Sequence, residues 1–212
     1  MFEFVMQPSV YSTGTNLGLR QILEKVWIHQ PKIGVGTIYI ISGFANFNGG
    51  ARFYRFFEKH INAGGKVSVI LGASTGQRLS SKQVVEALLQ CGAEVHLINR
   101  KRILHAKCYG YKNGEKETLV VSSGNFTGPG MSQNIEATIS LTDELISSCS
   151  FSWEDLFSSL LSQSWQIHAC SLTDPSAPFW DLLYDEIRKP EVIDTSDSQT
   201  LIMNLTHADT VR

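Results

Sequence analysis

Apolar positions in the first hundred residues follow two alternating periodicities. Within residues 15–30 they recur three and four positions apart, which places them on one face of a helix. Residues 37–44 instead form a short run of β-branched and aromatic side chains, which predicts a buried strand. The same signals continue as helices over 51–62 and 80–92 and strands over 66–71 and 94–98. Strands that alternate with helices favour a largely parallel sheet covered by helices.

The pattern changes in the second half of the chain. Three further strands are predicted over 104–111, 118–123 and 135–141, and an Asn-Gly pair at 113–114 predicts a hairpin between the first two. A helix is expected over 143–162. We therefore expect an α/β domain over residues 1–188, with a mixed β-sheet flanked by helices on both faces. Asp and Ser residues accumulate from residue 173, which indicates an appended segment that passes into a linker over 189–212.

Composition narrows the class of protein. The 212 residues are 42% hydrophobic and 18% charged, which fits one large domain with a sizeable core. No apolar run reaches the roughly 18 residues that span a membrane, and the N-terminus lacks the features of a signal peptide, so we expect a cytoplasmic protein without a membrane partner. The net charge of −2 lacks the basic surplus of a domain that grips nucleic acid alone. The cysteines form no C-x-x-C pair and predict neither a zinc site nor a disulfide framework: Cys91, Cys108, Cys149 and Cys170.

Four polar residues on the later strands suggest chemistry at a phosphodiester. On a strand, His105 and Lys107 point to the same face, so an imidazole and an ammonium project side by side. The imidazole can attack phosphorus while the ammonium holds the non-bridging oxygens. Asn125 can donate to the same oxygens, and Glu136 can accept a hydrogen bond from His105 Nδ1 and fix its tautomer. The first step then needs no metal, and no cofactor is expected.

These motifs resemble the phospholipase D superfamily. The chain has HAK at 105–107, SSGNFT at 122–127 and Glu136, where the family has H-x-K, then G-S-x-N and a later Glu. Ser122 stands in place of the usual Gly, and Lys112 stands in place of the family's Asp. Ser123, which matches the family's Ser, is expected to support the site.

Within this superfamily the chain resembles the catalytic domains of metal-independent restriction endonucleases of the BfiI and NgoAVII type. The similar passages include YIISGFANFNGG, RLSSKQVVE and LVVSSGNFTGPGMSQN. The resemblance implies a DNA endonuclease that forms a phosphohistidine and works as a homodimer. It also implies a separate C-terminal domain that recognises the DNA sequence and lies outside these residues.

A chemical argument reaches the dimer independently. In-line displacement at phosphorus places the nucleophile and the leaving group on opposite sides, and an acid is wanted at the leaving oxygen. The sequence contains one H-x-K and no second copy. A two-fold dimer would bring two copies of His105 together at its axis.

Several alternatives remain open. Gly72–Gly76 matches the G-x-S-x-G pattern of serine hydrolases, although the next helix signal begins only near Ser80. The basic stretch 100–102 is either a phosphate-binding element or a solvated turn. Other functions compatible with the motifs are a phospholipid hydrolase or phosphatidyl transferase, or a DNA-binding or scaffolding module with an inactive site. The sequence has no D/E-x-K triplet, which disfavours the magnesium-dependent restriction fold.

Overall fold

A computed structural model describes residues 2–114, 116–142 and 144–186. Within this part of the chain, nine strands form one mixed sheet in the order β2-β1-β8-β7-β6-β3-β4-β5-β9. The β3-β4 and β4-β5 pairs are parallel, and the other pairs are antiparallel. The strands are β1 (Phe2–Gln7), β2 (Tyr11–Ser12), β3 (Thr37–Ser42), β4 (Lys66–Ala73), β5 (Glu94–Asn99), β6 (Lys107–Asn113), β7 (Lys116–Ser122), β8 (Glu136–Thr142) and β9 (Gln166–Ala169).

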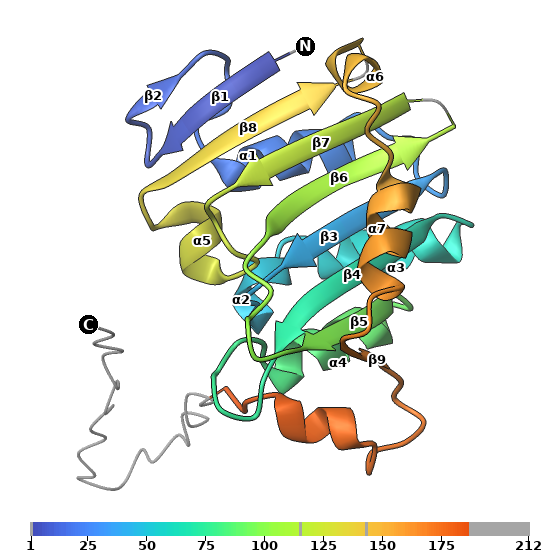
Figure 1. The fold of residues 1–212 in the computed structure, drawn as a ribbon. Helices are drawn as coiled ribbons and strands as arrows, with labels where there is room; N and C mark the ends of the chain where they lie inside the picture. The colour runs from blue at the N-terminus through green and yellow to red at the C-terminus, as the bar shows by residue number, and fades with distance from the viewer. Residues whose placement is uncertain (1, 115, 143, 187–212) are drawn as a thin grey trace, which may run out of the picture.

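Helices lie on both faces of the sheet, as Figure 1 shows. Behind the sheet in that view lie α1 (Leu19–Leu23) with the π-helix η1 (Glu24–His29), α3 (Tyr54–Asn62) and α4 (Lys82–Gln90). In front of it lie α6 (Glu144–Ser148) and α7 (Trp153–Leu161). Short helices α2 (Phe47–Gly50) and α5 (Gly128–Ser132) follow β3 and β7, and the 3-10 helix η2 (Pro178–Leu182) follows β9. The predicted mixed sheet with helices on both faces is confirmed.

Each face of the sheet has a core centred on a tryptophan. Trp27 of η1 is fully buried, donates from Nε1 to the carbonyl oxygen of Gly110 at 2.9 Å, and packs its ring edgewise on Phe53. On the other face, Trp153 of α7 stacks on Tyr39 with ring centroids 4.9 Å apart. The two indoles therefore attach helices to opposite sides of the same strands, and each satisfies its N–H while it contributes apolar area.

Several predicted boundaries were wrong. The helix expected over 143–162 is two helices, separated by a turn in which Ser150 has φ 52°. Strands β1, β2 and β9 were not predicted; β1 pairs with β8, far along the chain, and β9 pairs with β5. The segment after residue 173 is part of the domain, because Phe179, Leu182 and Leu183 are buried in the core. The predicted linker over 189–212 lies outside the described residues.

The predicted hairpin is confirmed. Asn113 pairs with Lys116, and Gly114 adopts φ 60°, the left-handed conformation that an Asn-Gly turn uses. Across the described ranges, no helix is both long and apolar enough to cross a membrane.

Candidate active site

The candidate catalytic residues gather at one edge of the sheet, where β3 and β7 end and β6 and β8 begin. Lys107 is the first residue of β6, Glu136 is the first residue of β8, and Asn125 lies three residues after β7. His105 precedes β6 rather than lying on it, so the prediction that it sits on a strand was wrong. Beside β3, the backbone pairing ends at the hydrogen bond from Gly43 N to Ala106 O at 3.0 Å, and the chain leaves the sheet at His105.

Although the chain leaves the strand at His105, the side chains of His105 and Lys107 remain in contact. Lys107 Nζ lies 3.0 Å from His105 Nε2 and donates to the His105 carbonyl oxygen at 2.9 Å. An ammonium only donates, so this contact requires a lone pair on Nε2 and assigns the ring proton to Nδ1. The imidazole is exposed and meets the ring of Phe44 at right angles, with centroids 6.1 Å apart. Nε2 is therefore the ring nitrogen that carries the free lone pair.

Lys107 is held in a desolvated position. Only 7% of the residue is exposed. Burial lowers the pKa of its ammonium below the ordinary lysine value, and the charge of Glu136 opposes that effect in part. A phosphate bound beside Lys107 would supply negative charge and would stabilise this buried ammonium.

Glu136 is buried, and its two oxygens have partners within the same edge. Ser123 Oγ donates to Oε2, and Asn134 Nδ2 donates to Oε1 at 3.1 Å. Among the described residues, no hydrogen bond joins Glu136 to His105. The expected orienting contact is therefore not made within one copy of the chain. The carboxylate instead fixes the position of Ser123, which also accepts from Ala137 N at 3.0 Å.

The loop that carries Asn125 is tied to the sheet on both sides. Tyr109 donates its hydroxyl to the Gly124 carbonyl oxygen at 2.8 Å, and Phe126 N donates to Ser42 Oγ at 2.9 Å. Burial raises the pKa of Tyr109, so its phenol stays a neutral donor. Asn125 Oδ1 is buried and has no hydrogen-bond partner in the described part of the chain. This unpaired oxygen is an acceptor, so it is available to a ligand that brings a hydrogen-bond donor.

Ser122, which stands where the family usually has Gly, fits this geometry. Its hydroxyl accepts from Gly124 N at 3.0 Å and lies 2.8 Å from Thr138 Oγ1, so it closes the turn that leads to Asn125. Lys112 lies at the opposite end of β6, where it pairs with Glu117 at 2.6 Å and with Glu154 of α7. This position therefore serves to attach α7 to the sheet.

Sequence reasoning missed the residues that support the site. Ser42, Phe44 and Asn46 lie at the end of β3 and just after it, where they hold the segments of His105 and Asn125, and Asn46 Oδ1 accepts from Gly128 N at 3.1 Å. Their signal was the passage YIISGFANFNGG, which contains all three. Tyr109 gave no signal beyond an aromatic residue on a strand.

The rival motifs form no competing site. Ser74 lies in a turn, where its hydroxyl accepts from Gly76 N at 3.2 Å, and α4 begins only at Lys82. A serine hydrolase elbow requires a helix directly after the serine. Arg100 stacks over the ring of Trp165 at 4.4 Å, so part of the basic stretch is structural. Within the described ranges, no three His, Cys, Asp or Glu side chains are grouped so as to hold a metal ion.

Residues 36–160, more than half of the chain, match the family described as "Cardiolipin synthase, PLD-like domain". No curated protein matches the chain. The fold is similar to Nuc, a phospholipase D family member from Salmonella typhimurium, with a TM-score of 0.53 and 16% identity over 81% of this chain and 98% of that one. NucT from Helicobacter pylori is similar with a TM-score of 0.54 and 15% identity, over 76% of this chain and 95% of that one. At these identities the likeness shows the fold alone.

Proposed function

The chain belongs to the PLD-like domain family, and from that premise we propose that it hydrolyses DNA phosphodiester bonds through a covalent phosphohistidine, without a metal ion. The observation that carries this proposal is the 3.0 Å contact between Lys107 Nζ and His105 Nε2. In this contact, Nε2 of His105 has the lone pair that would attack phosphorus. The ammonium of Lys107 beside it would bind the same phosphate.

In the first step, Nε2 of His105 attacks phosphorus, a P–N bond forms, and the P–O bond to one DNA strand end breaks. Lys107 exchanges its contact with the imidazole for a non-bridging oxygen of the phosphate, and Asn125 Nδ2 donates to another. Ser123 and Glu136 act as positioning residues, because they hold the start of the Asn125 loop against β8. These contacts favour charge that develops on the phosphoryl oxygens.

The leaving oxygen needs a proton from the side opposite His105. One exposed imidazole at the edge of the sheet cannot reach both sides of the phosphorus. We assign this proton to His105 of a second copy of the chain in a two-fold dimer. The second imidazole then takes a proton from water, the water oxygen attacks phosphorus, and the P–N bond breaks to restore neutral His105.

We favour DNA as the substrate. We propose that the chain is the cleavage domain of a restriction enzyme whose sequence-reading domain lies outside these residues. The net charge of −2 supports this division of labour, because affinity for DNA would come mainly from another module. A phospholipid substrate is the second candidate, since the description of the matching family names cardiolipin synthase. Substrate assays separate the two directly.

The test is cleavage of supercoiled plasmid DNA in excess EDTA by the wild-type chain and by His105→Ala. The matched control is His29→Ala, which removes another exposed histidine at the end of η1. We expect the wild type and the control to cleave and His105→Ala to be inactive. Mass spectrometry of an acid-free quench should show a phosphoryl adduct on the peptide that contains residue 105.

Two outcomes would overturn the mechanism. Cleavage that stops in EDTA would show that a metal ion is needed, and cleavage that persists in His105→Ala would show another nucleophile. If neither plasmid nor the small diester bis(p-nitrophenyl) phosphate is cleaved, while phosphatidyl lipid in vesicles is, the lipid candidate replaces the nuclease.

A further inference from the structure

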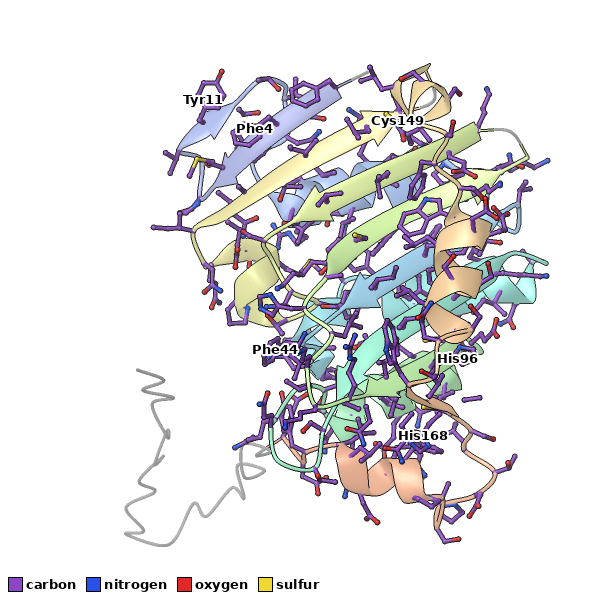
Figure 2. The ribbon with its side chains drawn as sticks, viewed as in Figure 1. Phe4, Tyr11, Phe44, His96, Cys149 and His168 are labelled. Atoms are coloured by element: carbon purple, nitrogen blue, oxygen red, sulfur yellow. The ribbon has the colours of Figure 1, made fainter. Side chains whose placement is uncertain are left out.

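A cavity of about 480 Å³ lies between η1 and strands β1, β6, β7 and β8, on the back face of the sheet in Figure 1. It lies at the end of these strands opposite the candidate active site, because its lining includes Lys116, the first residue of β7, and Thr142, the last residue of β8. Figure 2 shows the two ends: Phe44, which contacts His105, lies at one end, and Cys149, which follows α6, lies near the other. The proposed hydrolysis of DNA makes no use of this cavity.

The floor of the cavity is polar, because the strands turn hydroxyl and carboxyl groups toward it. Thr118 pairs with Tyr111 on one side and with Thr142 on the other, and all three line the cavity. In the next row, Ser140 pairs with Glu3. Thr118 and Ser140 are 8% and 6% exposed, and neither hydroxyl has a hydrogen-bond partner in the part of the chain that the structure describes. A buried hydroxyl without a protein partner costs free energy unless another molecule completes its hydrogen bonds.

The walls of the cavity carry positive charge. Among the described residues that line it, the cations are Lys25, Lys32 and Lys116, and Glu3 is the one anion. The Glu3 carboxylate already accepts from Asn16 Nδ2, at 2.7 and 2.9 Å to its two oxygens, and pairs with Lys25 at 3.3 Å. Lys32 and Lys116 are exposed and form no ion pair with any described residue. Two ammonium groups beside the cavity therefore remain available to an anion.

The size and the rest of the lining indicate an organic anion rather than a bare ion. Cavities of roughly 300–1,000 Å³ hold small-molecule ligands. Val26 and Pro31 supply apolar surface, and the amides of Gln30 and Asn113 can bind polar atoms of a ring. A phosphate ester combines an organic body with several acceptor oxygens, which suit ammonium and hydroxyl donors together.

We propose that this cavity binds a small phosphate ester the size of a mononucleotide. Lys32 and Lys116 bind its phosphate, and the hydroxyls of Thr118 and Ser140 donate to it from the floor. The site does not depend on the proposed hydrolysis, since it lies at the other end of β7 and β8 and shares no residue with the candidate active site. A ligand held between η1 and these strands binds only the folded chain and therefore stabilises it by mass action.

The test is isothermal titration of the full chain with adenosine monophosphate (AMP), and with adenosine, which lacks the phosphate. The variants are Lys116→Glu in the wall and Thr118→Val in the floor. Each removes a donor to a charged ligand, so we expect the dissociation constant for AMP to rise about 10-fold or more. The matched control is Lys59→Glu, an exposed lysine of α3 that does not line the cavity. This control and His105→Ala should bind AMP as the wild type does.

Thermal unfolding without ligand separates loss of binding from loss of the fold. Thr118→Val keeps the size of the side chain and removes a hydroxyl that has no protein partner, so its melting temperature should equal or exceed that of the wild type. Lys116 is exposed and unpaired among the described residues, so Lys116→Glu should also melt as the wild type does.

Three outcomes would overturn the proposal. The wild type does not bind AMP at millimolar concentration, or it binds adenosine as tightly as AMP, which would show that the phosphate is not recognised. Alternatively, AMP binding is lost in His105→Ala and kept in both cavity variants, which would place the ligand at the catalytic edge. None of these readouts depends on DNA cleavage, so the proposed function can fail while this site stands.

Discussion

Replacing Gly43 by alanine tests whether His105 is placed by the end of β3. An ideal Cβ on Gly43 would lie 2.4 Å from the Leu104 carbonyl oxygen and 3.1 Å from His105 Cα. The backbone at Gly43 does not have the positive φ that only glycine favours, so alanine fits the conformation and only the contact opposes it. The substitution therefore acts on the position of the His105 segment.

The size of the effect follows from the geometry. To restore an ordinary contact of 3.4 Å, the Leu104–His105 backbone must move about 1 Å away from β3. That movement stretches the hydrogen bond from Gly43 N to Ala106 O, now 3.0 Å, and costs about 1 kcal/mol of stability. A 1 Å misplacement of a reacting group lowers turnover on the order of 100-fold, or about 2.7 kcal/mol in activation free energy.

The assay is kcat for bis(p-nitrophenyl) phosphate, with melting followed by circular dichroism. Gly76→Ala is the matched control, because a Cβ at Gly76 meets nothing within 4 Å. We expect Gly43→Ala to melt cooperatively, slightly below the wild type, and to lose most of its turnover, while Gly76→Ala keeps it. A folded Gly43→Ala enzyme with kcat within threefold of the wild type would refute the reasoning.

Three further predictions concern residues of β6. Tyr109→Phe leaves the buried Gly124 carbonyl without its 2.8 Å donor, so the melt should show about 1–3 kcal/mol of lost stability and kcat should fall. Burial lowers the pKa of Lys107, and the protonated form binds phosphate, so wild-type activity should be lost as pH rises through a value below 10.5, while Lys107→Arg moves that loss to higher pH. Lys112→Met removes the cation beside buried Glu117 and should cost at least about 2 kcal/mol in denaturant unfolding with kcat unchanged.

The part of the fold that followed from sequence is the part with short-range signals. The strands at 37–42 and 66–73 are mostly apolar runs that begin directly after a glycine, because helices cover both of their faces. Strands β1 and β9 occupy outer positions of the sheet, and their pairings with β8 and β5 join distant parts of the chain. The local sequence of a strand does not predict pairing with a strand that is distant along the chain.

The candidate site divides in the same way. The H-x-K and S-x-N motifs identified the side chains that meet at one edge, since antiparallel pairing of β6, β7 and β8 brings their ends together. The partner of Glu136 could not be predicted, because Ser123 and Asn134 compete for the same oxygens as His105 and only the turn geometry decides between them. The spacing of the motifs therefore predicts which side chains lie close together, whereas the path of the backbone decides which of them form hydrogen bonds.

Strand β8 shows why alternation alone does not determine which face of a strand is buried. The period of two separates Ala137, Ile139 and Leu141 from Glu136, Thr138 and Ser140, and the usual rule would turn the apolar set inward. The chain instead buries the polar set, because Gln7, Leu19 and α5 occupy that side with hydrogen bonds. The hydrogen bonds available on each side of β8 therefore decide which set is buried.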